Sequence, residues 1–216
     1  MLVSVHVPKC AGTSFRQILY AVYGARIWFN YGTVFSQEQA RPDLVPPGTS
    51  VIHGHFLADA FDRLFSERKL LTWVRHPVER VVSNYQHFLR APDMRDDCCR
   101  AIYERKLGLR GFADLDWMRN MATRYLANKP VEDFEFIGIT DCFEQSIEHF
   151  YRTFGYRRLQ IHPGENLNPH RTSELYNVSA ADKAFILERN MADLAWYDQA
   201  ARRLAKEIAD RSARTG

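Results

Sequence analysis

The stretch LVSVHVPKCAGTSFRQILYAVYG, residues 2 to 24, decides the fold class of this chain. Residues 2–7 are apolar and rich in β-branched side chains, which predicts a short buried strand that ends at Pro8. Residues 13–24 predict a helix whose buried face is formed by Phe15, Ile18, Leu19 and Val22. A strand that leads directly into a helix is typical of the first unit of an α/β sheet.

The alternation of strand and helix continues along the chain. Further strands are predicted over 50–55, 69–75 and 134–139. Helices are predicted over 57–66, from Pro77 to about 90, and after Thr140, which can cap the helix that follows it. Strands joined by crossover helices run parallel, so the predicted fold class is α/β, with a parallel β-sheet flanked by helices.

The C-terminal part of the chain predicts one long helical segment over about 179–211. Ser179 and Asp182 have the spacing of a capping box at its start. Its apolar stripe comprises Leu187, Met191, Leu194, Tyr197, Ala201, Leu204 and Ile208. We expect this stripe to pack against the body of the protein, and the alternative is a seam that forms a homodimer. Loops are predicted over 41–49, 91–99 and 162–173.

The composition excludes several classes of protein. The chain has 216 residues, 46% of them hydrophobic and 25% charged, which favours one soluble domain spanning 1–216. The net charge of +3 gives no reason to expect a nucleic-acid partner. We expect no transmembrane segment and no signal peptide, and therefore a cytoplasmic location.

The cysteines indicate free thiols. The spacing of the four cysteines fits neither a zinc site nor a dense disulfide framework. They are Cys10, Cys98, Cys99 and Cys142. Free thiols are typical of a reducing compartment.

The loop after the first predicted strand has the composition of an anion site. Ligands of parallel sheets bind beyond the C-terminal ends of the strands, and the N-terminus of a helix attracts an anion there. Gly12 allows close backbone approach, Thr13 and Ser14 add hydroxyl donors, and Lys9 adds a positive charge. The lysine precedes the glycine, so the loop is not a Walker A motif. The alternative is an ordinary strand-to-helix turn with Lys9 in solvent.

A second stretch, VRHPVERVVSNY at 74–85, indicates a second anion site. Arg75 ends the third predicted strand, and Ser83 follows within the first two turns of the next helix. An arginine and a serine beside one cleft can bind a phosphate. We expect Arg80, in contrast, to pair with a carboxylate of the protein.

Together the two stretches resemble the signatures of the carbohydrate sulfotransferases that use 3′-phosphoadenosine 5′-phosphosulfate (PAPS). The resemblance is closest to the group that contains heparan sulfate 2-O-sulfotransferase. The first signature reads roughly H-[IV]-P-K-[TC]-x-G-T-[ST], and residues 6–14 read HVPKCAGTS. The second reads R-[DN]-P-x-x-R-x-x-S-x-[YF], and residues 75–85 read RHPVERVVSNY, which departs from it at His76.

The resemblance implies a P-loop-NTPase-like sulfotransferase fold, PAPS as donor and 3′,5′-adenosine bisphosphate as product. It implies that the 5′-phosphosulfate lies against Lys9, Cys10, Ala11, Gly12, Thr13 and Ser14. Arg75 and Ser83 would bind the 3′-phosphate. The stretch ENLNPHRTS at 165–173 resembles the nucleotide-covering loop of the family, and it adds Asn168, Arg171 and Thr172.

The sequence IHGHF at 52–56 supplies a candidate general base. A base must take the proton of the acceptor hydroxyl, and histidine suits that task because its free pKa is about 6.5. His53 and His55 lie two residues apart on an extended segment, so they face the same side. The resembled 2-O-sulfotransferases have a matching H-G-H with a histidine base. We therefore predict His55 as base and His53 as helper or alternative base. We expect His6 to be buried and structural.

Lys9 has a second predicted role, which is to stabilise the negative charge that develops on the leaving oxygen. This scheme requires no metal. The acceptor is predicted to be a small molecule or a carbohydrate hydroxyl, and the chain is predicted to be a bacterial enzyme.

Two other functions stay open. A P-loop small-molecule kinase would share the architecture, but it needs a Walker lysine and an acidic residue that holds Mg²⁺. A catalytically inactive nucleotide-binding protein would keep Lys9, Arg75 and Ser83 and would not need His55.

Overall fold

A computed structural model describes residues 1–157 and 178–215, and it has one five-stranded sheet in which every pairing is parallel. The order across the sheet is β2-β3-β1-β4-β5. The strands are β1 (Leu2–Val5), β2 (Ile27–Asn30), β3 (Val51–Gly54), β4 (Lys69–Val74) and β5 (Phe134–Ile139). The predicted α/β fold class is confirmed.

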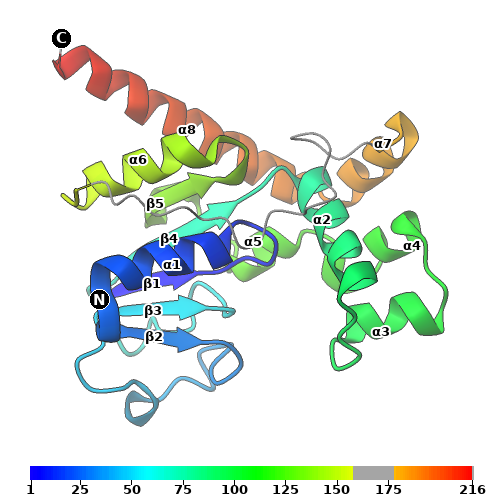
Figure 1. Ribbon diagram of the computed structural model, residues 1–216, viewed down its shortest axis with the longest axis horizontal. Coiled ribbons are helices and arrows are strands. Elements are labelled where there is room, and N and C mark those ends of the chain that lie inside the picture. Colours follow the sequence, from blue (N-terminus) through cyan, green and yellow to red (C-terminus); the bar gives the residue numbers. More distant parts are fainter. Residues whose placement is uncertain (158–177, 216) are drawn as a thin grey trace.

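Helices cover the sheet and gather at its C-terminal edge (Figure 1). They are α1 (Gly12–Tyr23), α2 (Pro77–Arg90), α3 (Asp97–Glu104), α4 (Leu109–Ala113), α5 (Met121–Tyr125), α6 (Phe143–Thr153), α7 (Ala180–Arg189) and α8 (Met191–Thr215). Figure 1 shows α1, α6 and α8 along the strands, and α2, α3, α4 and α7 beyond the strand ends.

An aromatic cluster joins α1 and α6 to the sheet. Phe15 of α1 meets Phe150 of α6 with 5.0 Å between ring centroids, and it lies 5.5 Å from the ring of Trp73 in β4. Phe136 of β5 packs against Phe150 at 5.3 Å. Burying a side chain of this size stabilises the fold by roughly 1.5–3 kcal/mol, so α1 is firmly fixed on the sheet.

The strand order places a topological switch point at the two central strands. The chain leaves β1 toward β2 and β3 on one side, and it leaves β4 toward β5 on the other side. Ligands of open parallel sheets bind in the crevice that this reversal creates at the C-terminal strand ends. The loops after β1 and β4 therefore adjoin, because Val5 of β1 pairs with Thr72 of β4.

In the segment between the first helix and β4, one predicted element is wrong and one strand was missed. Residues 57–66 form successive turns and not a helix. The reason is tertiary, because Leu57 N–H donates to the Phe35 carbonyl and Ala58 N–H donates to the Tyr125 carbonyl. The strand β2 was not predicted. It is a four-residue edge strand that is specified by its pairing with β3.

Three further predictions need correction after α2. The predicted loop 91–99 contains the start of α3, and Asp96 caps that helix by accepting from the N–H groups of Cys98 and Cys99. Thr140 does not cap α6, because its hydroxyl donates to the Val74 carbonyl at 3.0 Å and a 3₁₀ turn intervenes.

The predicted helix over 179–211 is two helices, α7 and α8, separated at Asn190. The Asn190 amide donates to the Ile186 carbonyl and accepts from Asn120 N–H, so it ends α7. The predicted cap is confirmed, since Ser179 Oγ accepts from Asp182 N–H at 3.1 Å. The predicted loop 162–173 lies outside the described residues.

Candidate active site

The loop after β1 presents a helix N-terminus to the crevice. The helix α1 begins at Gly12, and Ala11, with φ of 55°, has no side-chain oxygen that could cap it. The first turn contains no acidic residue. Lys9 also has positive φ, at 66°, and the Cys10 N–H donates to the Val7 carbonyl at 3.2 Å. An uncapped helix N-terminus beside a lysine is typical of an anion site.

Gly12 is required for close packing within this loop. A Cβ at this position would lie 1.9 Å from Cδ2 of the His6 imidazole. The group that approaches Gly12 is the His6 ring, and the predicted approach of the backbone to an anion stays a prediction. Thr13 and Ser14 follow in the first turn, and both are half-buried.

The loop after β4 supplies the second cation. Arg75 is buried, and its guanidinium pairs with the carboxylate of Glu79 at 3.2 Å, one helical turn into α2. Ser83, also buried, lies one turn further along the same face of α2. Arg75 precedes α2, and its partner Glu79 and Ser83 lie one turn apart on that helix.

Charges link the two loops. The pKa of Lys9 is lowered from 10.5 to about 8, chiefly by burial and next by the nearby guanidinium groups of Arg90 and Arg75. Burial also lowers the pKa of His87, with Lys9 and Arg90 as the next causes. The structure therefore brings Lys9 and Arg75 to one edge of the sheet, and it adds Arg90 and His87, which the sequence analysis did not identify.

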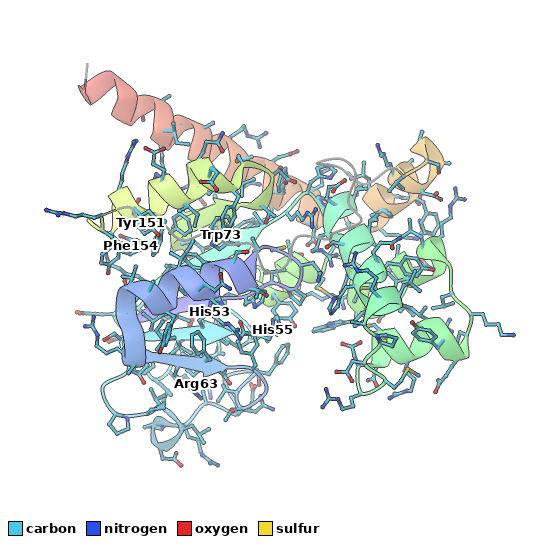
Figure 2. The ribbon with its side chains drawn as sticks, viewed as in Figure 1. His53, His55, Arg63, Trp73, Tyr151 and Phe154 are labelled. Carbon is cyan, nitrogen blue, oxygen red and sulfur yellow. The ribbon has the colours of Figure 1, made fainter. Side chains whose placement is uncertain are left out.

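The H-G-H segment ends β3 in the same region (Figure 2). A Cβ on Gly54 would lie 1.8 Å from the Asn30 carbonyl oxygen of β2, so the predicted close backbone approach is confirmed. His55 N–H donates to that same carbonyl at 3.1 Å. These contacts turn the chain at the strand end and aim His55 toward the crevice.

His53 is buried inside the protein. Its Nδ1 pairs with Ser4 Oγ of β1 at 2.9 Å, and the Phe15 ring lies edge-on to it at 6.2 Å. Burial lowers its pKa to about 3, and the neighbouring His55 contributes next. The imidazole is therefore neutral at physiological pH and packed beneath the site.

His55 has the geometry of an oriented base. It is half-buried, and its Nδ1 lies 2.7 Å from the His6 carbonyl oxygen. A carbonyl can only accept, so Nδ1 carries the proton and Nε2 keeps its lone pair in the neutral ring. Burial lowers the pKa of His55 below 6.5, with the His6 carbonyl acting in the opposite direction.

The cysteines and the predicted nucleotide-covering loop complete the set of candidate residues. All four cysteines are free, as predicted, and burial raises the pKa of Cys10 to about 12. Asn168, Arg171 and Thr172 lie outside the described residues.

Within residues 1–157 and 178–215, no group of His, Cys, Asp and Glu side chains is arranged to hold a metal ion. In that same part of the chain, no helix is long and apolar enough to cross a membrane.

Comparisons with known proteins agree with the fold. The model of a protein family described as "Sulfotransferase family" matches residues 1–211. A crystal structure of a sulfotransferase from Alicyclobacillus acidocaldarius is similar to this chain with a TM-score of 0.52 and 14% identity, covering 92% of this chain and 94% of that chain. At that identity the likeness concerns the fold alone. No curated protein matches the chain.

A parallel α/β sheet with cationic loops at its switch point is typical of proteins that bind anionic ligands there. Within that class, the chain belongs to the sulfotransferase family. The closer likeness to the heparan sulfate 2-O-sulfotransferase group stays a prediction. The cytoplasmic location and the homodimer also stay predictions.

Proposed function

We propose that this protein is a PAPS-dependent O-sulfotransferase that acts on a hydroxyl of a carbohydrate, as a single domain spanning 1–216. The observation that carries the proposal is the pair of cationic loops on neighbouring strands β1 and β4, in a chain of this family. The acceptor class rests on the resemblance of residues 6–14 and 75–85 to the heparan sulfate 2-O-sulfotransferase group.

The residues of the first loop fit the 5′-phosphosulfate of PAPS. An uncapped helix N-terminus, a lysine and two hydroxyls form a set of donors for an anion, and the loop consists of Lys9, Cys10, Ala11, Gly12, Thr13 and Ser14. In this proposal Arg75 and Ser83 bind the 3′-phosphate. Asn168, Arg171 and Thr172 are proposed as nucleotide contacts on the family resemblance alone.

The transfer is proposed to proceed in line. The acceptor hydroxyl oxygen attacks sulfur while the bond between sulfur and the 5′-phosphate oxygen breaks. His55 Nε2 takes the hydroxyl proton, and Lys9 stabilises the negative charge that develops on the departing oxygen. The products are the sulfated acceptor and 3′,5′-adenosine bisphosphate.

Between the two histidines, the geometry favours His55 as the base. Its Nδ1 is held by the His6 carbonyl, which leaves Nε2 available to accept a proton. His53 is buried against Ser4 and β1, so we propose that it supports the strand end and does not contact the acceptor.

Nucleotide preference separates this proposal from a small-molecule kinase. Saturation with 3′,5′-adenosine bisphosphate at 100 times its Kd would stabilise the fold by about 2.7 kcal/mol, measured as a thermal shift. Preference for ADP with Mg²⁺ would contradict the proposal.

The Arg75→Ala variant should bind 3′,5′-adenosine bisphosphate at least tenfold more weakly, by about 1.5–3 kcal/mol, and should bind 5′-AMP as the wild type does. Equal weakening of both nucleotides would refute the 3′-phosphate contact.

A transfer assay separates the proposal from an inactive nucleotide-binding protein. The His55→Ala variant should lose about 10²–10⁴-fold in the rate of transfer from labelled PAPS to a panel of saccharides. It should keep its affinity for 3′,5′-adenosine bisphosphate. Unchanged turnover would remove His55 as the base.

A further inference from the structure

His6 connects the candidate base to the sheet through its backbone. Its N–H donates to the Gly54 carbonyl at 2.8 Å, which extends the β1–β3 pairing one residue beyond the strand end. Its carbonyl then accepts from Nδ1 of His55 at 2.7 Å. The His55 side chain is therefore held by the residue that follows β1, in the same chain segment as the donor loop.

The His6 ring lies between that base and the donor loop. The imidazoles of His6 and His55 are stacked, with 4.3 Å between centroids and 27° between planes. On another side, the His6 ring lies where a side chain of residue 12 would be, 1.9 Å from an ideal Cβ on Gly12. The His6 ring therefore lies against both the N-terminus of α1 and the ring of His55.

Tyr31 fixes the rotation of the His6 ring. Its hydroxyl lies 3.0 Å from His6 Nδ1, and its own ring stands edge-on to His55 at 4.9 Å. Tyr31 directly follows β2 and is 40% exposed, so its ring lies partly at the surface beside the rings of His6 and His55. Burial raises the pKa of Tyr31 to about 12, so the phenol stays neutral and keeps its proton.

We infer that His6, held by Tyr31, is a positioning residue that aligns Nε2 of His55 with the donor loop at Gly12. The inference rests on the proposed function, because it assigns His55 as the base. It goes beyond that function because it gives roles to His6 and Tyr31, which are neither the two cations Lys9 and Arg75 nor part of the H-G-H segment. Neither residue touches the reacting atoms in this scheme, since both act through His55.

The expected effect follows from the geometry of transfer. A misplacement of about 1 Å at a reacting group can lower a rate by roughly 10²-fold. The loss of a single neutral hydrogen bond that orients such a group should lower the rate by less. Loss of the Tyr31 hydroxyl should therefore slow turnover by about five- to tenfold. Donor affinity should not change, since the Tyr31 hydroxyl makes no contact with the donor loop in this scheme.

The first test uses Tyr31→Phe, which removes one oxygen atom from a partly exposed side chain. Turnover of PAPS is measured with heparan sulfate as the probe acceptor, together with the Kd for 3′,5′-adenosine bisphosphate. We expect kcat to fall about five- to tenfold with unchanged Kd. The double variant with His6→Phe should be no slower than His6→Phe alone, because both changes remove the same bond. Unchanged kcat, or a full additional loss in the double variant, would overturn the inference.

The control variant is Tyr20→Phe, on the exposed side of α1, where the side chain is 60% exposed. It should keep wild-type kcat and Kd.

A second test needs no acceptor and follows the ring nitrogens of His55 by ¹⁵N NMR. The wild type should show a protonated Nδ1 and a bare Nε2 at pH 7.5, and Tyr31→Phe should shift and broaden these signals. Identical His55 signals in both proteins would refute the positioning role. If the wild type transfers no sulfate but the His55 signals respond, the proposed function fails and the contact among the three residues stands.

Discussion

In the proposed mechanism, Lys9 and His55 have opposite requirements for their protonation states. Lys9 must be charged to stabilise the leaving oxygen, and its pKa of about 8 keeps it charged below that pH. His55 must be neutral to accept a proton, and its pKa, lowered by burial, keeps it neutral above 6.5. Both residues are therefore in their working states in the window between these two values.

The pH dependence of kcat/KM for PAPS should be bell-shaped. We expect the acid limb to lie below pH 6.5, from His55, and the basic limb to lie near pH 8, from Lys9 in the free enzyme. The basic limb of kcat should lie higher, because a bound phosphate raises the pKa of Lys9. The Lys9→Arg variant is the control, since arginine stays charged and the basic limb should disappear. A basic limb that persists near pH 8 in that variant would assign it to another group.

At the scale of the structural element, α1 and its entry loop depend on the small size of residue 12. The Gly12→Ala variant places a Cβ 1.9 Å from the His6 ring, so either the ring or the start of α1 must move. We expect a loss of about 1–3 kcal/mol in unfolding free energy in urea, and at least tenfold weaker binding of 3′,5′-adenosine bisphosphate.

Gly108→Ala is the matched control, because Gly108 has φ of −75° and an added Cβ would meet nothing within 4 Å. It should keep wild-type nucleotide affinity, with at most a small loss of stability because Gly108 is the N-cap of α4. Wild-type nucleotide affinity in Gly12→Ala would show that the His6 ring does not restrain the loop.

The elements that the sequence predicted are those whose signals are local. The strand before Pro8, the helix from Pro77 and the cap at Ser179 each depend on neighbouring residues. The elements that were predicted wrongly or missed depend on hydrogen-bond partners that are distant in the sequence. Residues 57–66 were predicted as a helix, but the N–H groups of Leu57 and Ala58 bond to the carbonyls of Phe35 and Tyr125. The strand β2 exists because β3 lies beside it.

The candidate site divides in the same way. Lys9, Arg75 and His55 were found because their residue types recur at fixed positions in short motifs. Tyr31 was missed, since nothing in its neighbourhood signals that the end of β2 lies beside β3 and that its hydroxyl reaches His6. His6 was identified as buried and structural, and its stacking on His55 is a contact between segments about fifty residues apart.

At the scale of the whole molecule, one buried arginine joins three parts of the chain. Arg80 of α2 donates to the Met118 carbonyl at 3.0 Å and to Asn190 Oδ1 at 3.3 Å, and it lies 3.7 Å from the Asp193 carboxylate of α8. The predicted pairing of Arg80 with a carboxylate is confirmed. These contacts hold α2, which carries Ser83, against the C-terminal helices.

Removal of this charge should destabilise the whole fold. The Arg80→Met variant leaves Asp193 buried without its cation, and we expect the unfolding free energy in urea to fall by about 3–5 kcal/mol. The control is Arg95→Met, because Arg95 pairs with Asp93 on the surface, and this variant should show no measurable change. Equal effects of the two substitutions would contradict the central role of Arg80.

The burial of Cys10 has a practical consequence for studying the loop after β1. With its pKa raised to about 12, the thiol is protected from alkylating reagents while the loop is closed. Iodoacetamide should therefore modify the half-buried Cys98 and Cys142 first, and mass spectrometry would time the slower labelling of Cys10. Saturating 3′,5′-adenosine bisphosphate should slow that labelling further. The rate at which Cys10 is labelled thus reports how often the loop after β1, the proposed nucleotide-binding loop, exposes its thiol.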